Sequence, residues 1–345
     1  MLIIGEIAIN NTALVTGSSG FIGFHLSSLL LSCDWTVIGL DSMTNYYDVN
    51  LKKARLAKLN ENLNFQNYTG LVQNEKLLEK IFSKHKPSIV VHLAAQAGVR
   101  YSIDQPLSYV ESNLIGTFQI LEISRKYSPK HLLIASTSSV YGSNKEFPLN
   151  ENQRTSTPMS FYAATKKSNE IMAHSYSHLF NIPTTIFRFF TVYGPWGRPD
   201  MALFKFTKNI LADTPIDVYN KGNMVRDFTY VSDLVKAIFL LITKIPKKPN
   251  SRKVIFKNDS ISDVAPFRVV NIGNSQPVNL LDYIKELERV LQKNAKKNFM
   301  DMQDGDIHKT HSNVSLLEAL TDFSPKTTVR QGITEFVKWY KAYYV

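Results

Sequence analysis

A glycine-rich turn near the N-terminus constrains the fold of this 345-residue chain more than any other feature. The segment Thr16-Gly17-Ser18-Ser19-Gly20-Phe21-Ile22-Gly23 directly follows a β-branched run, residues 12–16, and opens an amphipathic stretch, residues 21–32. A strand that turns this tightly into a helix is typical of the first half of a βαβ unit. Gly17 allows the tight turn, Gly20 lets a ligand approach the backbone, and Gly23 brings helix and strand close together.

Strand-like runs and amphipathic stretches continue to alternate over the first 190 residues. Strands are expected at 35–40, 88–93, 131–136 and 183–190, and helices at 50–60, 74–84, 103–127 and 159–180. This alternation predicts an α/β fold of the Rossmann type, in which helices cover both faces of a doubly wound parallel sheet. We therefore predict a nucleotide-binding domain over residues 1–190.

The regular alternation ends near residue 191, and residues 191–345 are expected to form mainly a smaller α+β domain for the substrate. Its expected strands are 216–219, 225–231 and 268–272, and its expected helices are 201–212, 232–243, 279–292 and 330–343. The segments near 224–244 and 268–272 are candidates to return to the first domain. The polar, basic and proline-bearing segment from about 245 to 266 reads as a surface insertion.

Composition excludes several classes of protein. The chain is 44% hydrophobic and 20% charged, as in ordinary globular proteins, and no apolar run approaches the roughly 18 residues of a membrane span. The segment Met1–Glu6 lacks the positive charge that opens a secretory signal, so we expect a cytoplasmic protein. The single cysteine, Cys33, excludes an internal disulfide and a thiolate zinc site, and we expect no metal.

The net charge of +11 raises the question of nucleic acid or a membrane surface as a partner. Lysine and arginine are scattered, however, without interleaved aromatic platforms, and the densest run, residues 244–253, is a loop. We therefore expect neither partner. A basic enzyme that acts on an anionic substrate explains the charge equally well.

The glycine-rich turn predicts a dinucleotide site. The free N–H groups at the start of the helix can bind the phosphates. Asp41 ends the second strand, 18 residues after Gly23, where a carboxylate accepts from both hydroxyls of an adenosine ribose and repels a 2′-phosphate. NAD is therefore favoured over NADP.

Tyr162 and Lys166 are the candidate catalytic pair. They lie in a helical pattern, so the i, i+4 spacing places the phenol and the ammonium on one face. A fixed ammonium and a positive nicotinamide ring both favour the phenolate. Spacing alone also fits a surface pair, but the fifth strand leads into Thr137, whose hydroxyl lies at the carboxyl edge of the sheet, where ligands of such folds bind. We interpret His92, at the end of the fourth strand, as structural.

Long strings of this sequence resemble the extended short-chain dehydrogenase/reductases, and among them the UDP-glucuronate 4-epimerases. The resemblance runs from about Thr12 to Tyr344. It is carried by GFIGFHL (20–26), NYYDVNLKKARL (45–56), HLAAQAGVRYS (92–102), YAATKKSNEIMAHSYSHLF (162–180), RFFTVYGPWGRPDMALFKFT (188–207), VRDFTYVSD (225–233), VVNIGNS (269–275) and MQDGDIHKT (302–310).

The resemblance implies a reversible C4 epimerisation of UDP-glucuronate to UDP-galacturonate through a transient 4-keto sugar, with NAD bound throughout. It assigns catalysis to Tyr162, Lys166 and Thr137. It assigns the cofactor to Gly17, Gly20, Phe21, Ile22, Gly23, Asp41, Asn45, Leu93, Ala94, Ala95, Gln96, Asn113, Tyr162 and Lys166. It assigns the UDP-sugar to Arg100, Thr137, Ser138, Ser139, Tyr162, Thr191, Arg198, Val218, Tyr219, Arg226 and Asp306. It also implies a homodimer through the helices near 103–125 and 160–180.

Within this resemblance, Arg198 is the candidate reader of the sugar carboxylate, because a guanidinium fork matches a carboxylate in two places. The other interpretation of Arg198 is a loop residue paired with Asp200. The segment Gly70-Leu71-Val72 departs from the Gly-Asp-Ile of many relatives, so adenine recognition is weaker or comes from the backbone. The first ten residues have no counterpart in the family.

Other reactions are compatible with the same fold. The 4,6-dehydratases place an acid pair after the threonine, where this chain has Ser138-Ser139. The UDP-glucuronate decarboxylases usually have a glutamate at the position of Ser139, so decarboxylation is expected only as a minor side reaction. A 4-epimerase of UDP-N-acetylglucosamine or its uronate remains an alternative that pocket size decides. A sensor that binds NAD without catalysis is disfavoured, since it has no need of Thr137, Tyr162 and Lys166 together.

Overall fold

The computed structural model describes residues 11–248 and 258–345. The segment Met1–Glu6, in which a secretory signal was sought, and the part of the basic run 244–253 that follows residue 248 lie outside the described residues. Over the two described ranges, no helix has the length and apolar character that crossing a membrane requires.

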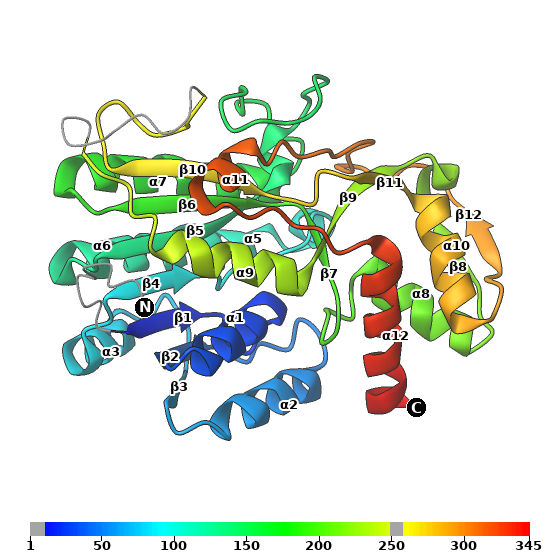
Figure 1. Ribbon diagram of the computed structural model, residues 1–345, viewed down its shortest axis with the longest axis horizontal. Coiled ribbons are helices and arrows are strands. Elements are labelled where there is room, and N and C mark those ends of the chain that lie inside the picture. The colour runs from blue at the N-terminus through cyan, green and yellow to red at the C-terminus, as the bar shows by residue number, and fades with distance from the viewer. Residues whose placement is uncertain (1–10, 249–257) are drawn as a thin grey trace, which may run out of the picture.

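A seven-stranded parallel sheet forms the centre of the fold (Figure 1). The strand order is β10-β6-β5-β4-β1-β2-β3, which is the order of a doubly wound dinucleotide-binding sheet with one added edge strand. The strands are β1 (Thr12–Thr16), β2 (Thr36–Asp41), β3 (Phe65–Thr69), β4 (Ile89–His92), β5 (His131–Thr137), β6 (Thr184–Phe189) and β10 (Phe267–Ile272). The predicted fold class is confirmed.

Helices cover both faces of this sheet because alternate strand residues point to opposite sides. In β1, Ala13 and Val15 pack into the core on one face and Leu14 into the core on the other. The first face is covered by α1 (Phe21–Ser32), α2 (Val49–Asn60), α9 (Val231–Ile242) and α11 (Ser315–Thr321). The second face is covered by α3 (Glu75–His85), α6 (Gly116–Tyr127) and α7 (Phe161–Phe180).

The single helix expected at 103–127 is wrong in its N-terminal half. The structure has α4 (Tyr101–Asp104), α5 (Pro106–Tyr109) and a π-helical segment, η1 (Val110–Ile115), before α6 begins. Pro106 has no amide hydrogen to continue the first turn, so α4 ends before it. The wider turn of η1 contains Asn113, and such π-helical turns are frequent at functional sites.

A second apolar core lies beside the carboxyl ends of the large sheet, on the right of Figure 1. It contains buried residues of α8 (Ala202–Leu211), α10 (Leu280–Leu291) and α12 (Val329–Tyr344). Two small sheets accompany it: one has the order β11-β9-β7, and the other pairs β12 with β8. These strands are β7 (Thr191–Tyr193), β8 (Ile216–Val218), β9 (Val225–Tyr230), β11 (Pro277–Asn279) and β12 (Lys297–Phe299).

The chain crosses between the two regions more than once. Segment 267–272 forms β10, an edge strand of the large sheet, and α9 packs against α1. Strand β9, just before α9, pairs instead with β7 and β11. The large sheet and the second core are therefore joined through the segment 225–242.

Candidate active site

The candidate site lies where β1, β2, β4 and β5 end. These strands are parallel and adjacent, so Thr16, Asp41, His92 and Thr137 reach the same edge of the sheet. The strand order turns back on either side of β1 and β4, and ligands of open α/β sheets bind outside such a point.

The turn between β1 and α1 has the backbone shape expected of a phosphate-binding loop. Gly17 has a φ of +72°, and a Cβ atom there would lie 3.0 Å from the amide nitrogen of Ala94. A Cβ on Gly23 would lie 2.0 Å from the carbonyl oxygen of Gly17, so only glycine permits this contact of helix and turn. Phe21 and Ile22 begin α1, and Gly20 before them offers no side-chain cap. Helix N–H groups are thereby left for a ligand.

Asp41 is fixed against the same turn. One carboxylate oxygen accepts from the Ser19 amide at 3.1 Å and the other from the Met43 amide at 2.8 Å. The hydroxyls of Ser18 and Ser19 are buried here without a hydrogen-bond partner in the described part of the chain. Orphaned polar atoms, a cradle of glycines and a carboxylate at the end of β2 all fit a dinucleotide with a free ribose 2′-hydroxyl. Asn45 lies in the segment between Asp41 and α2.

The segment after β4 forms a wall beside this turn. The Thr16 hydroxyl accepts from the amides of Leu93 and Ala94, each at 3.1 Å, and lies 2.8 Å from His92 Nδ1. His92 Nε2 lies 3.2 Å from the Thr117 hydroxyl. Burial lowers the pKa of His92 to about 3, so the ring is neutral at physiological pH. These contacts support the interpretation of His92 as structural.

Asn113 connects that wall to helix α7. Its amide group exchanges hydrogen bonds with the backbone of Gln96, at 2.8 and 3.1 Å, and donates to the Thr165 hydroxyl at 3.0 Å. Thr165 lies between Tyr162 and Lys166 in α7. The π-helical turn therefore holds α7 at a fixed distance from the segment 93–96, which includes Ala95.

Tyr162, Lys166 and Thr137 converge at the start of α7 and the end of β5. Burial raises the pKa of the Tyr162 phenol, while a hydrogen bond with Thr137 and the charge of Arg198 act in the opposite direction. Lys166 donates from Nζ to the Ala135 carbonyl at 2.9 Å, and burial lowers its pKa to about 8. Burial therefore outweighs the effect of Thr137 and Arg198 on the Tyr162 pKa. Groups perturbed in this way cluster at functional sites.

The hydroxyls after Thr137 lie on a tight 3-10 turn, η2 (Ser138–Tyr141). The Ser139 amide donates to the Thr137 hydroxyl at 3.2 Å, and Thr137 donates to the Ser139 hydroxyl at 3.3 Å. Ser138 is buried beside them. Three adjacent hydroxyls therefore end β5, next to Tyr162.

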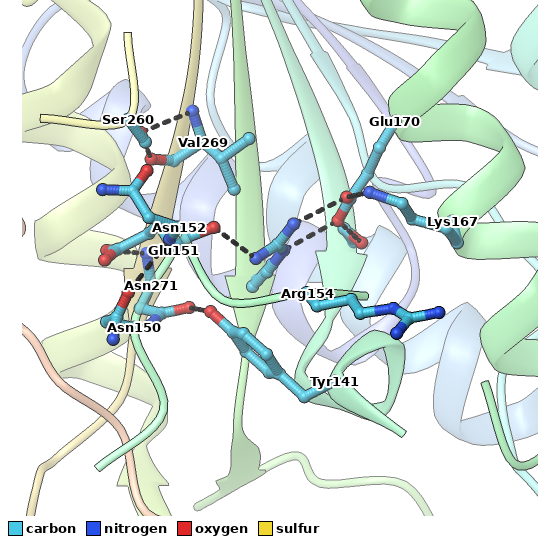
Figure 2. Close-up of polar contacts among 12 residues, drawn as sticks. Tyr141, Asn150, Glu151, Asn152, Arg154, Lys167, Glu170, Ser260, Val269 and Asn271 are labelled. Carbon is cyan, nitrogen blue, oxygen red and sulfur yellow. Dashed lines mark hydrogen bonds and ion pairs between the residues drawn. The ribbon is translucent and has the colours of Figure 1, made fainter. Parts of the chain in front are cut away.

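A buried polar network lies behind the catalytic helix (Figure 2). Arg188 on β6 donates to both carboxylate oxygens of Glu170 on α7, at 3.0 and 2.9 Å, and Ser136 donates to Glu170 at 2.7 Å. Arg188 also lies over the Tyr141 ring, whose hydroxyl donates to Asn271 at 2.7 Å. Ser136 directly precedes Thr137, so this network fixes β5 against α7 at the point where the candidate catalytic side chains extend from them.

Arg198 reaches the site from the segment 194–201, which connects β7 to α8. It donates to both oxygens of Asp200, from Nε at 2.9 Å and from Nη2 at 2.5 Å, and Asp200 also accepts from the Tyr46 hydroxyl at 3.2 Å. A Cβ on Gly98 would lie 3.9 Å from Arg198 Nη2. Arg198 is thus both paired with Asp200, as one interpretation of the sequence had it, and close enough to lower the pKa of Tyr162. Thr191 opens β7, at the start of the same connection.

The remaining candidate substrate residues gather at the edge of the second core. The Arg100 guanidinium lies 4.4 Å from the centre of the Tyr219 ring and 3.2 Å from Asp306, which lies 4.0 Å from Arg226. Val218 ends β8 directly before Tyr219. Two arginines beside an aromatic ring can bind a diphosphate and a planar base.

A model of the NAD dependent epimerase/dehydratase family matches residues 13–255 of the chain. The chain belongs to this family.

Relatives within the epimerase/dehydratase family match nearly the whole chain. Protein CapI of Staphylococcus aureus is 51% identical over 332 residues, which are 96% of this chain and 98% of that protein. The probable UDP-glucuronate 4-epimerase of Rhizobium meliloti (strain 1021) is 48% identical over 331 residues, 96% of this chain and 97% of the relative. The crystal structure of UDP-glucuronic acid 4-epimerase from Bacillus cereus, in complex with UDP-glucuronic acid and NAD, superimposes with a TM-score of 0.86 at 32% identity, covering 96% and 100% of the two chains.

Three residues of this family member that contact the site were absent from the sequence-based set: Tyr46, Arg55 and His25. Tyr46 binds Asp200, Arg55 donates to the Ser19 carbonyl, and His25 bonds to the Pro195 carbonyl at 2.8 Å. The bonds of Tyr46 and His25 span more than 150 residues of sequence, so local pattern gave no signal for these two residues. For Arg55, the available signal was a basic residue spaced to lie with Leu51 and Leu59 on the buried side of α2.

Proposed function

We propose that this protein is a UDP-glucuronate 4-epimerase that interconverts UDP-glucuronate and UDP-galacturonate with NAD kept in the site. The observation that carries the proposal is the convergence of Thr137, Tyr162 and Lys166 at the carboxyl edge of a dinucleotide-binding sheet, with Arg198 close to the same phenol. The similarity to the probable UDP-glucuronate 4-epimerase of Rhizobium meliloti and to UDP-glucuronic acid 4-epimerase of Bacillus cereus supports the same substrate.

Tyr162, Thr137 and Lys166 each have a separate role in the proposed reaction. NAD, when bound, supplies a reversible hydride acceptor for C4 of the sugar. Tyr162 removes the proton of the C4 hydroxyl, and Thr137, whose hydroxyl favours the phenolate of Tyr162, orients that C4 hydroxyl. Lys166 adds positive charge beside the phenolate and donates to the nicotinamide ribose. After the keto sugar has rotated to present its other face to the cofactor, Tyr162 returns the proton to the C4 oxygen.

Arg198 and the hydroxyls of Thr191, Ser138 and Ser139 are proposed to hold the C6 carboxylate. A uronate that is oxidised at C4 is a β-keto acid, and it loses carbon dioxide when its carboxylate aligns with the carbonyl. A carboxylate held in place by a charged fork is kept out of that alignment. The absence of an acid pair at Ser138-Ser139 also fits a reaction without dehydration.

The experiment is a substrate assay without added reductant. Purified protein is denatured to measure released NAD, and native protein is incubated with UDP-glucuronate and, separately, with UDP-galacturonate and UDP-N-acetylglucosamine. We expect NAD in the extract and the same equilibrium mixture from either uronate, separated by chromatography. Protein that contains NAD and converts neither uronate would refute the proposed function.

We also propose that the protein is a cytoplasmic homodimer. Its one cysteine remains free, as is usual in reducing compartments. Helices α6 and α7 pack side by side and leave Phe118, Ile171 and Leu179 42–62% exposed, an apolar face that a second copy of the chain would cover. Light scattering should give twice the mass of one chain, and Ile171→Asp should reduce it to a single chain.

A further inference from the structure

Arg55 is a fully buried arginine of α2 whose partners are all uncharged. Its guanidinium donates to the Ser19 carbonyl at 3.0 Å and the Tyr47 hydroxyl at 2.8 Å, and to the carbonyls of Trp196 at 2.5 Å and Gly197 at 3.3 Å. Its exposed fraction is 0%, and it forms no ion pair with a carboxylate of residues 11–248 or 258–345. Burying a charge without a counter-charge is costly, so such a residue calls for a reason beyond stability.

The partners of Arg55 belong to the two halves of the site. Ser19 lies in the dinucleotide turn, and its amide nitrogen donates to Asp41. Trp196 and Gly197 directly precede Arg198 in the segment 194–201. One side chain therefore connects the backbone that receives the cofactor to the backbone that presents Arg198.

Besides Arg55, the segment 194–201 is held by His25, which bonds to the Pro195 carbonyl, by Tyr46, which bonds to Asp200, and by contacts of the Trp196 ring. The Trp196 ring lies near Lys58 of α2, at 5.7 Å, and against Trp339 of α12, at 5.4 Å. Trp196 has a φ of 59°, a conformation that a residue with a large side chain keeps only when its surroundings hold it. The two bonds from Arg55 to carbonyls at this bend supply such a restraint.

We propose that Arg55 is a positioning residue that couples the occupied dinucleotide turn to the segment carrying Arg198. Binding of the cofactor orders the turn and fixes the position of the Ser19 carbonyl. Because the Arg55 guanidinium is bonded to that carbonyl, its own position and that of the Trp196 and Gly197 carbonyls become fixed as well. Arg198, the next residue, is then held at the sugar. The identity of the sugar rests on the proposed function, whereas the coupling between the two segments does not.

The coupling is tested by hydrogen–deuterium exchange of the full chain, stripped of NAD and again with NAD added back. Three proteins are compared: wild type, Arg55→Met, and Arg268→Met as a control. Arg268 is also a buried arginine, but it lies on β10 and pairs with Asp259, at 2.9 and 3.0 Å. It contacts neither the dinucleotide turn nor the segment 194–201. In wild type and the control, NAD should slow exchange in residues 194–201 by about tenfold, a usual size for coupling between sites. In Arg55→Met that NAD-dependent slowing should disappear.

Substrate discrimination provides a second readout. The ratio of kcat/KM for UDP-glucuronate to that for neutral UDP-glucose should fall about tenfold in NAD-saturated Arg55→Met. A displaced Arg198 guanidinium misses the carboxylate of the uronate alone, whereas any effect of Arg198 on Tyr162 is common to both sugars and cancels in the ratio. The control variant should keep the wild-type ratio. If Arg55→Met does not fold, Arg55→Lys takes its place, since lysine keeps the charge but cannot bridge both carbonyl groups.

The outcomes separate the two proposals. Equal NAD-dependent slowing in Arg55→Met and wild type, or no slowing in wild type, overturns the coupling. An unchanged substrate ratio in Arg55→Met overturns the positioning of Arg198. Wild type that fails to convert either uronate refutes the proposed function, and the exchange experiment then still decides the role of Arg55.

Discussion

Replacing Lys166 with methionine should make the NAD-free protein more stable at pH 7 while it removes turnover. Lys166 is only 4% exposed, and burial lowers its pKa from 10.5 to about 8. At about 1.4 kcal/mol per pH unit, this difference means that the charged form costs about 3 kcal/mol of folding free energy. Methionine removes that cost but also the hydrogen bond to the Ala135 carbonyl, worth about 1 kcal/mol. A net gain of about 2 kcal/mol follows.

The gain should depend on pH in a direction that the two pKa values set. Below pH 8, both the folded and the unfolded chain hold the Lys166 proton, and the full cost is present. Between pH 8 and 10.5 the folded chain has lost the proton while the unfolded chain still binds it, so the stability of wild type rises with pH. The advantage of Lys166→Met should therefore shrink over this window.

Urea unfolding of the NAD-free proteins, followed by tryptophan fluorescence at several values between pH 7 and pH 10, measures this difference directly. Subtracting the free energy of unfolding of wild type from that of the variant at each pH cancels the contribution of all other titrating groups. Lys167→Met is the matched control, because Lys167 is the next residue of α7 but forms an ion pair with Glu170 at 3.1 Å. Its loss should lower stability slightly at pH 7. A Lys166→Met variant that is no more stable than wild type at pH 7, or whose advantage is constant up to pH 10, would refute the reasoning.

Three further changes test other parts of the site and fold. Tyr162→Phe should lower kcat about 10³-fold, the middle of the range for a lost general base, while the protein still releases NAD on denaturation; retained turnover would exclude the phenol as the base. Arg198→Ala should reduce kcat/KM for UDP-glucuronate about 10- to 100-fold more than for UDP-glucose, as expected for a lost hydrogen bond to a charge, and an equal loss for both sugars would contradict its role. Acidification from pH 6.5 to 4 should destabilise the protein by up to about 4 kcal/mol per pH unit, because burial lowers the folded-state pKa of three histidines and the unfolded chain then binds up to three more protons. The three histidines are His25 (pKa about 4), His92 (about 3) and His131 (about 4). Proton uptake on acid unfolding measures this effect, and an uptake below one proton would count against it.

The parts of the fold that could be predicted are those encoded by neighbouring residues. The strand, turn and helix around Gly17 are formed by one short segment, and α1 spans Phe21–Ser32, as its periodicity predicted. The π-helical turn at Asn113 could not be predicted in this way, because it depends on bonds to Gln96 and Thr165. Strands β7, β11 and β12 have three residues each and were also missed. Such strands exist only through their partners.

The candidate site shows the same division. Spacing placed the Tyr162 and Lys166 side chains on one face of a helix, and strand position placed Thr137 beside them. Spacing also offered the pairing of Arg198 with Asp200, two residues apart, which the structure shows. A substrate carboxylate must therefore share Arg198 with Asp200 or bind its remaining donors. Spacing could not reveal that Arg55 joins the two halves of the site, because that contact depends on how separate segments pack.

The network around Glu170 explains why the Lys166 ammonium forms no ion pair with this carboxylate. Glu170 follows Lys166 by one turn of α7, and a lysine and a glutamate at that spacing commonly form an ion pair. Here Arg188 occupies both oxygens of the carboxylate, and Ser136 and Lys167 donate to them as well (Figure 2). Lys166 is left with the Ala135 carbonyl as its acceptor, so burial and not a counter-charge controls its pKa. The ion pair of Arg188 and Glu170 thus leaves Lys166 without a carboxylate partner, as the proposed role of its ammonium beside Tyr162 requires, although keeping that charge buried makes the fold less stable.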